Sequence, residues 1–386
     1  MIYLDNSATT ELLPSVKQAM IRAIETYGNP SSTHAAGIEA RRLIDKARDQ
    51  VSGALGMGRL SAENLFFTAS GSEANNTAIM GVAYAKQKRR QNRIITTDSE
   101  HSSVENVMHK LENDGFEVVR LSTRGGVIDE QQFLANMNND VLLVSFMMVN
   151  NETGAVYDVK KLFSMAKRIN PDVVTHCDAV QGFLKIPFTP KSICADLVSV
   201  SAHKIHGPKG VGALYVSPEI IKTKKLIPLI LGGGQEAGFR SGTENVVGIS
   251  GFGEAAERSR ADFAESVQKM RSLRDMCEQL LKDGEVVFNV PCGQRAPHVL
   301  SVTLPNIKSE TMLNFLSAKG ICVSAGSACA SHGRHTSSAL LGFGLTPEAA
   351  DTTVRISFCE LNTEDEVQTF VEAFKEGIAG LTRIKR

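Results

Sequence analysis

Short apolar runs alternate with amphipathic stretches through the first two-thirds of this 386-residue chain, and no other feature constrains its fold more. Such alternation is typical of β-α-β units wound around a mostly parallel sheet. It predicts an α/β fold with helices between most of the strands, including 14–27, 36–55, 102–113 and 158–169. The strands are expected near residues 65–68, 93–97, 118–121, 141–149, 173–177, 197–201 and 211–216.

The pattern changes after residue 253. The charged stretch 254–283 predicts a long helix, and helices are also expected over 311–319 and at the end of the chain. Short strands are expected near residues 286–289, 298–304, 322–324 and 353–358. This grouping predicts a second, smaller α+β domain. Two domains also suit the length, because single cores stop growing at roughly 250–300 residues.

The charge balance argues against nucleic acid and membrane surfaces as primary partners. Lys and Arg together number 42, as do Asp and Glu, so the formal net charge is +0, and no basic block stands out beyond the segments 86–90 and 383–386. No apolar run approaches the roughly 18 residues that cross a bilayer, and the first residues lack the pattern of a signal peptide. We therefore expect a soluble, cytoplasmic protein.

Seven cysteines are scattered along the chain without a C-x-x-C pair, so neither a disulfide framework nor a zinc ribbon is expected. Cys329 lies amid small residues in an expected exposed loop, where a thiol is accessible enough to act as a nucleophile. Cys322, on an expected strand, is instead interpreted as a core thiol. His332 and His335 follow Cys329, but the spacing matches no zinc motif, and no metal site is predicted.

Lys204 lies just after the apolar run 197–201 and just before a turn that contains Gly207 and Gly210. A lysine at a strand end, beside a backbone that can approach a ligand closely, is suited to form a Schiff base with an aldehyde cofactor. The alternative is a solvated lysine in a loop, because lysines are mostly exposed.

Two further strand ends offer what pyridoxal phosphate requires. The segment 68–75 passes through Gly71 and Ser72 into a helix, whose free N–H groups and positive dipole end bind phosphate. An ordinary capped helix is the alternative. Asp178 ends a buried strand, where its carboxylate can keep a pyridine nitrogen protonated or, alternatively, cap the next helix.

His101 and Arg355 complete the set of candidate side chains. His101 follows an expected strand at the edge where open α/β sheets bind ligands, so its ring can stack on a pyridine ring and transfer protons. It can equally be a structural histidine. Arg355 lies on an expected strand of the smaller domain, where it can bind a substrate carboxylate or form a surface ion pair.

Seven segments that span the chain in order resemble the motifs of the cysteine desulfurases, class V members of the fold-type I pyridoxal phosphate enzymes. The segments are Leu4-Asp-Asn-Ser-Ala-Thr-Thr10, Gly28-Asn-Pro-Ser-Ser-Thr-His34, Val149-Asn-Asn-Glu-Thr-Gly154, Asp178-Ala-Val-Gln181, Ser201-Ala-His-Lys204, Arg240-Ser-Gly-Thr-Glu-Asn245 and Gly326-Ser-Ala-Cys329. The form of the last segment resembles the branch that serves nitrogen fixation and iron–sulfur cluster assembly.

The resemblance implies a homodimer with a large domain over residues 13–253 and a small domain made of 1–12 and 254–386. In the cofactor site that it implies, Lys204 forms the Schiff base and Asp178 pairs with the pyridinium nitrogen. Gln181 contacts the phenolic oxygen, and His101 stacks on the ring. The implied phosphate-binding residues are Gly71, Ser72, Ser201, His203 and, from the neighbouring subunit, Thr243.

The implied reaction converts L-cysteine to L-alanine. Asn150 and Arg355 bind the substrate carboxylate, and Cys329 takes the sulfur as a persulfide before it passes to an iron–sulfur scaffold or a tRNA-thiolation enzyme. Three residues depart from the family pattern: Ala237 stands where arginine is frequent, Cys359 where glycine is usual, and Ser72 where threonine is frequent, although the hydroxyl is kept. The remaining alternatives are a class V aminotransferase, a selenocysteine lyase and a sulfur carrier or scaffold without catalytic activity.

Overall fold

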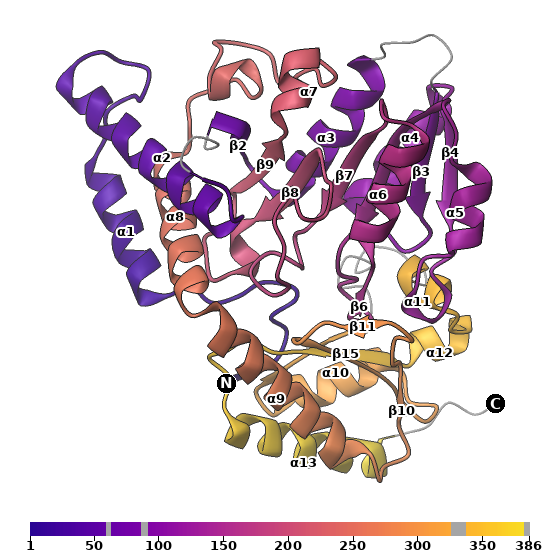
Figure 1. Cartoon of the computed structure of the whole chain (residues 1–386). Coiled ribbons are helices and arrows are strands. Elements are labelled where there is room, and N and C mark those ends of the chain that lie inside the picture. The colour runs from indigo at the N-terminus through magenta and orange to yellow at the C-terminus, as the bar shows by residue number, and fades with distance from the viewer. Residues whose placement is uncertain (59–62, 86–91, 326–336, 382–386) are drawn as a thin grey trace.

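A computed structural model describes residues 1–58, 63–85, 92–325 and 337–381, and its largest element is a seven-stranded sheet (Figure 1). The strand order is β2-β9-β8-β7-β5-β3-β4, and β9 runs antiparallel to both of its neighbours while the other pairs are parallel. The predicted mostly parallel α/β sheet is therefore confirmed. Its strands are β2 (Leu65–Thr68), β3 (Arg93–Thr97), β4 (Glu117–Leu121), β5 (Val141–Met147), β7 (Val174–Asp178), β8 (Leu197–Ser201) and β9 (Gly212–Val216).

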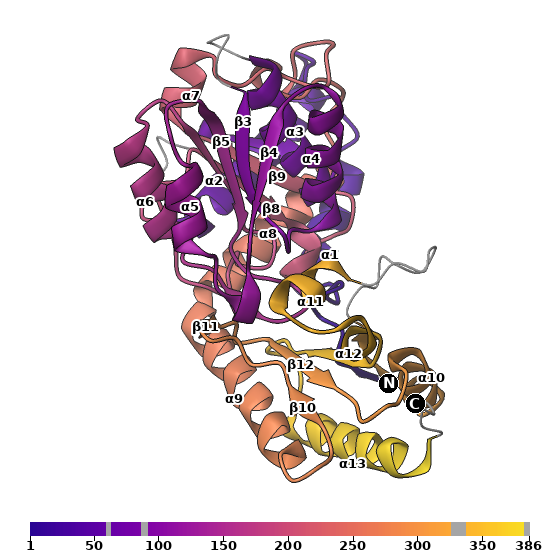
Figure 2. The same cartoon turned by 90° about the vertical axis from the view of Figure 1, so that its right-hand side faces the viewer.

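Helices cover both faces of this sheet, with α3 and α4 on one side and α5 and α6 on the other (Figure 2). Consecutive strand residues pack into opposite cores: Ile95 and Val198 belong to one cluster, and Ile94 and Leu197 to the other. Burial on both faces explains why the central strands are continuously apolar. The helices are α1 (Pro14–Glu25), α2 (Ala35–Ala54), α3 (Gly71–Ala85), α4 (Ser102–Asn113), α5 (Glu130–Asn136), α6 (Val159–Ile169), α7 (Pro218–Thr223) and α8 (Val246–Ala261).

A second, four-stranded antiparallel sheet has the order β10-β12-β15-β14 and its own apolar core. The chain start joins this part of the molecule, because β1 pairs in parallel with β13. Its strands are β1 (Ile2–Tyr3), β10 (Val287–Phe288), β12 (Val299–Thr303), β13 (Ile321–Cys322), β14 (Ser324–Ala325) and β15 (Thr353–Ser357). Its helices are α9 (Phe263–Leu281), α10 (Ser309–Ala318), α11 (Ser338–Phe343), α12 (Pro347–Asp351) and α13 (Glu364–Gly380).

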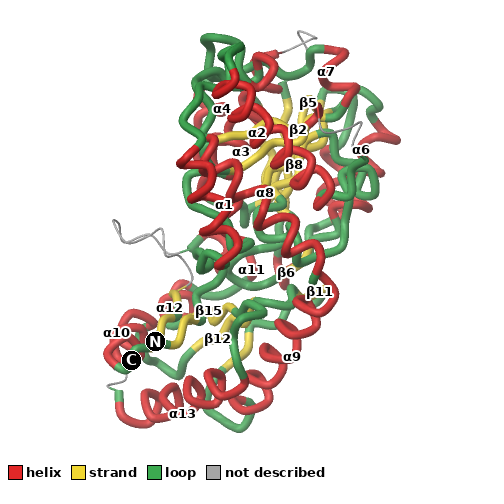
Figure 3. The backbone as a smooth tube through the Cα atoms, turned by 90° about the vertical axis from the view of Figure 1, so that its left-hand side faces the viewer, coloured by secondary structure: helices red, strands yellow, loops and turns green. Residues whose placement is uncertain are grey.

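Besides the N-terminal segment that leads from β1 to α1, two connections link the parts around the two sheets. In Figure 3, α8 and α9 follow one another from the seven-stranded sheet to the four-stranded one, and they meet at Asp262 within the stretch predicted as a single helix. The pairing of β6 (Ala155–Val156) with β11 (Gln294–Arg295) is the second connection. The proposed domain division remains a prediction, and its boundary at residue 253 lies inside α8.

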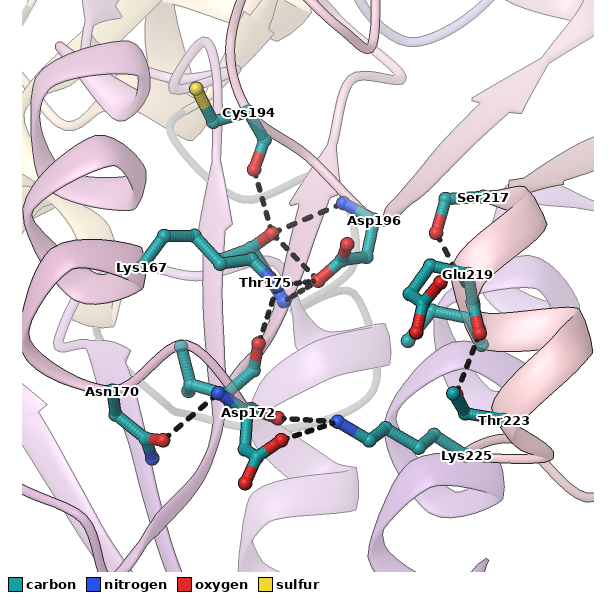
Figure 4. A network of polar contacts seen from close by, with 12 residues as sticks. Lys167, Asn170, Asp172, Thr175, Cys194, Asp196, Ser217, Glu219, Thr223 and Lys225 are labelled. Atoms are coloured by element: carbon teal, nitrogen blue, oxygen red, sulfur yellow. Dashed lines mark hydrogen bonds and ion pairs between the residues drawn. The ribbon is translucent and has the colours of Figure 1, made fainter.

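Side-chain networks occupy the amino ends of the central strands (Figure 4). Asp196 accepts hydrogen bonds from the Lys167 ammonium at 2.5 Å and from the backbone N–H of Thr175 at 3.0 Å. The Thr175 hydroxyl donates in turn to the carbonyl of Cys194 at 2.8 Å. The polar groups at this edge of the sheet are hydrogen-bonded to one another. Ligands of open α/β sheets bind at the opposite edge, where the parallel strands end.

The loop before α8 is anchored by a buried ion pair. Arg48 of α2 donates to both carboxylate oxygens of Glu236, each at 2.7 Å, and the N–H of Phe67 donates to the same carboxylate at 2.8 Å. Glu236 and Ala237 both have left-handed backbones, with φ of 49° and 53°. The ion pair therefore holds a strained turn against β2.

Within the described residues, no helix is both long enough and apolar enough to cross a membrane.

Candidate active site

A cavity of about 760 Å³ lies at the carboxyl ends of the central strands. This volume is in the range of small-molecule and cofactor sites. The cavity brings together most of the residues predicted from the sequence: Gly71, Ser72, His101, Asp178, Gln181, Ser201, His203, Lys204 and Arg355. Cys329 lies outside the described residues. Thr243 is exposed and does not line the cavity of this chain, and its contribution to a neighbouring subunit stays a prediction.

Lys204 ends the short 3-10 turn that follows β8, as its position in the sequence predicts. Its amine donates to two backbone carbonyls of the N-terminal segment, Ser7 at 2.6 Å and Ala8 at 2.8 Å. Burial, together with the nearby charges of Arg355 and Lys185, lowers its pKa to about 7 against the opposing charges of Asp5 and Asp178. The chain thus presents a weakly basic amine inside the cavity.

Asp178 ends β7 and is connected to His101 by two side chains. Asn75 of α3 donates to the Asp178 carboxylate at 2.7 Å and to the Ser103 hydroxyl at 2.9 Å. The N–H of Ser103 donates to Nδ1 of His101 at 3.1 Å, so this nitrogen carries a lone pair and a neutral ring carries its proton on Nε2. Burial, together with the charge of Lys204, lowers the pKa of His101 against the opposing effect of Asp178.

The start of α3 forms a cradle suited to an anion. The first N–H groups of a helix have no intrahelical acceptor, and the dipole end is positive. A side chain at Gly71 would lie 2.8 Å from Val180 and 3.3 Å from the Cβ atom of Ser201, so only glycine leaves this space open. The Ser201 hydroxyl is buried and has no hydrogen-bond partner among the described residues, which suits a donor that awaits a ligand oxygen.

His203 and Gln181 border the same cavity. Nδ1 of His203 lies 3.2 Å from the Thr9 hydroxyl, and burial lowers the pKa of this ring to about 4, so the ring is a neutral hydrogen-bonding group. Gln181 donates to the carbonyl of Ser7 at 2.8 Å, and its carbonyl oxygen lies 3.2 Å from Nε2 of His298.

Arg355 lines the cavity from β15, a strand of the second sheet. Its Nη2 donates to Asp5 at 2.7 Å and its Nη1 to the carbonyl of Asn151 at 3.0 Å. Its Nε is buried and has no partner among the described residues. Since a guanidinium binds carboxylates through parallel N–H donors, this free donor suits the carboxylate of a small ligand.

Asn150 was predicted to bind a substrate carboxylate, but in this conformation its side chain is used internally. Its Oδ1 accepts from the N–H groups of Glu152 and Thr153, and its Nδ2 donates to the carbonyl of Ser99. The neighbouring Asn151 lines the cavity instead. The role of Asn150 stays a prediction.

Two buried acids in the cavity have no role in the sequence analysis. Glu100 accepts from the Thr97 hydroxyl and the N–H of Met147, and burial raises its pKa to about 8. Glu152 accepts from the Ser337 hydroxyl at 2.6 Å, and burial raises its pKa to about 7 although this bond and Arg355 lower it. Glu100 directly precedes the candidate residue His101, and Glu152 lies in the segment 149–154 that resembles a family motif; these positions were the available signal.

Comparison with known proteins agrees with this geometry. The family model described as "Aminotransferase class-V" matches residues 2–370. A cysteine desulfurase of Trichormus azollae is 37% identical over 380 residues, which is 97% of this chain and 92% of that protein.

Two solved structures are similar over nearly the whole chain. A structure described as a NifS-like protein has a TM-score of 0.91 and 37% identity, and covers 98% of this chain and 100% of its own. A structure described as SspA in complex with cysteine has a TM-score of 0.80 and 30% identity, with coverage of 94% and 100%.

Proposed function

The chain belongs to the aminotransferase class V family, and from this premise we propose that it is a pyridoxal phosphate-dependent cysteine desulfurase. The reaction converts L-cysteine to L-alanine and passes the sulfur first to Cys329 and then to an acceptor protein. One observation carries the proposal: a buried lysine, an acid at a strand end, an anion cradle and an arginine with a free donor share one cavity.

The donor groups in the cavity fit pyridoxal phosphate. The unpartnered Ser201 hydroxyl, Gly71 and the start of α3 would hold the phosphate, with Ser72 and His203 beside them. When bound, the cofactor supplies an aldehyde for amines and a protonated ring that accepts electron density from the substrate Cα. Asp178 would face the ring nitrogen, Gln181 the phenolic oxygen and His101 the ring face.

The residues of the chain then have separate tasks. Arg355 orients the substrate through its carboxylate, using the Nε donor that the fold leaves free. The amine of Lys204 accepts the proton that leaves the substrate Cα, because it is the basic nitrogen held in the cavity. Asn75 fixes the carboxylate of Asp178 by its hydrogen bond at 2.7 Å.

Sulfur transfer requires a thiolate, which we assign to Cys329. Its sulfur forms a bond with the substrate sulfur while the bond between that sulfur and Cβ breaks. The electron pair of the broken bond stays with the carbon fragment, and Cβ takes up a proton to become the methyl group of alanine. The products are a persulfide on the enzyme and alanine, so no external oxidant or reductant is needed. We further propose a cytoplasmic homodimer in which Thr243 completes the phosphate site of the other subunit, and an iron–sulfur scaffold or a tRNA-thiolation enzyme as acceptor.

The test is to incubate the holoenzyme with L-cysteine and to measure alanine and the mass of the peptide that bears Cys329. The wild type should form alanine and gain one sulfur atom on this peptide, and C329S should do neither while its cofactor absorbance is retained. C194S is the control, because Cys194 is an exposed thiol at the other edge of the sheet. Alanine formation by C329S at the wild-type rate would contradict the assignment of Cys329, and a requirement for a 2-oxo acid would indicate an aminotransferase.

A further inference from the structure

Three side chains with metal-binding atoms meet beneath the loop that carries Lys204. The atoms of His206, Cys359 and Glu360 that could bind a metal all lie within 4.8 Å of one another. Among the residues that the structure describes, this is the one group of three such side chains at this spacing. His206 lies far from Cys359 and Glu360 in the sequence, so no sequence motif indicates the cluster and no metal is predicted from the sequence.

The ring of His206 is oriented as in a metal ligand. Its Nδ1 lies 2.8 Å from the carbonyl oxygen of Glu11, and since a carbonyl only accepts, Nδ1 must carry a proton. This leaves Nε2 to face Glu360 and Cys359. Metal-binding histidines characteristically donate their other N–H to a carbonyl or carboxylate, which fixes the tautomer and the ring. The N–H of His206 also donates to the Thr10 hydroxyl at 2.7 Å, so the backbone is held as well.

The separation between His206 and Glu360 is compatible with two ligands of one cation as well as with a long ion pair. Nε2 of His206 and Oε1 of Glu360 are 3.4 Å apart. A charge-assisted hydrogen bond between such groups is shorter, about 2.7–2.9 Å. Two ligands that each lie about 2.05 Å from a tetrahedral zinc ion are about 3.3 Å apart. The observed separation therefore suits a pair of ligands to one cation.

Burial and access also suit a bound metal. Cys359 is 6% exposed and His206 3% exposed, while the side chain of Glu360 is 25% exposed, so an ion can enter from one side. A further charged group near this cluster is Lys185, which is buried and donates to the carbonyl of Lys204 at 2.7 Å.

We propose that His206, Cys359 and Glu360 bind one Zn²⁺ ion, with water in the fourth position. One nitrogen, one sulfur and one carboxylate oxygen form a donor set typical of zinc, and three protein ligands leave one position open. Binding releases the thiol proton of Cys359 to solvent and changes no oxidation state. The ion clamps the N-terminal segment and the end of β15 to the loop after Lys204. The proposal is independent of the proposed function.

The test uses the full-length holoenzyme without a metal-binding tag. After incubation with Zn²⁺ and removal of free metal, wild-type protein should retain about one zinc ion per chain by elemental analysis. C359S should lose it, and E360Q should bind at least roughly tenfold more weakly. C292S is the matched control, because Cys292 is an exposed cysteine outside the cluster, and it should bind like the wild type. With Co²⁺ in place of Zn²⁺, only proteins that keep Cys359 should show thiolate-to-cobalt absorption.

Each other outcome overturns the proposal. Absence of retained zinc and of cobalt absorption in the wild type would show that the cluster is an imidazolium–carboxylate pair beside a thiol. Equal zinc retention by the wild type, C359S and E360Q would place any bound metal elsewhere. If C359S does not fold, the zinc retention of E360Q is compared with that of C292S, and equal retention overturns the proposal. E360Q is expected to fold because Glu360 lies at the exposed side of the cluster. Cysteine desulfurase activity has no part in this readout, so failure of one proposal leaves the other standing.

Discussion

Replacing Glu152 by glutamine should remove a pH dependence of folding that the buried cavity creates. Glu152 is 8% exposed, accepts one hydrogen bond from Ser337 and lies near Arg355. Burial nevertheless dominates and raises its pKa from 4.5 to about 7. Glutamine has the same shape and still accepts from Ser337, but it has no proton to lose.

The sign of the effect follows from which state binds the proton. The folded pKa lies above the unfolded one, so between pH 4.5 and about 7 the folded state holds a proton that the unfolded chain releases. The stability that this proton contributes is complete below the unfolded pKa and is lost as the pH rises through the folded pKa. Each pKa unit is worth about 1.4 kcal/mol, so the full loss is roughly 3 kcal/mol, of which about 2.5 kcal/mol falls between pH 5 and pH 8.

The measurement is urea unfolding of the wild type and E152Q at pH 5 and pH 8. The free energy of unfolding of E152Q, relative to the wild type, should rise by about 2.5 kcal/mol from the lower to the higher pH. The comparison isolates Glu152, because Glu100 and the other buried acids are present in both proteins. E39Q changes an exposed glutamate of α2 and should shift stability by less than about 0.5 kcal/mol at either pH. A constant difference between E152Q and the wild type would refute the reasoning.

Two further substitutions test the fold and the cradle. R48M leaves the carboxylate of Glu236 buried without its ion pair, so it should lower the free energy of unfolding by about 3–5 kcal/mol in a urea titration. R42M is the control: it breaks an exposed ion pair and should change the free energy of unfolding by less than about 0.5 kcal/mol. G71A places a methyl group in the anion cradle, and because overpacking costs about 1–3 kcal/mol it should weaken pyridoxal phosphate binding roughly ten- to hundredfold in a cofactor titration. G53A is the control, since a side chain there meets nothing within 4 Å, and equal affinities of G71A and G53A would argue against the cradle.

The central strands could be predicted because their pattern comes from burial alone. The predicted bounds 65–68, 93–97 and 197–201 agree with β2, β3 and β8, whose residues are almost all buried on both faces. The two-residue strands β6 and β11 were not predicted. They are too short for periodicity and exist because the tertiary fold brings them together. For the same reason the break between α8 and α9 was not visible within the charged stretch.

In the site, too, some residues could be predicted from the sequence and others could not. The difference is whether the role of a residue depends on its position in the chain or on the direction of its side chain. Residues at strand ends, such as Asp178 and Lys204, could be predicted because the carboxyl ends of parallel strands meet at one edge. Asn75 and Glu152 could not, because their roles depend on which way a helix or loop side chain points after packing. The adjacent residues Asn150 and Asn151 make the difference plain, since only the second lines the cavity.

The N-terminal segment connects these separately positioned residues into one site. Its carbonyls at Ser7 and Ala8 accept both hydrogen bonds of the Lys204 amine, and the carbonyl of Ser7 also accepts from Gln181. Two residues earlier, Asp5 pairs with Arg355. Backbone carbonyls of the N-terminal segment supply these contacts to Lys204. The path of the segment's backbone therefore positions the lysine more than the segment's side chains do. That path is fixed at one end by the pairing of β1 with β13 and by the bridge between Asp5 and Ser357 of β15, so the second sheet positions the lysine as well as the arginine.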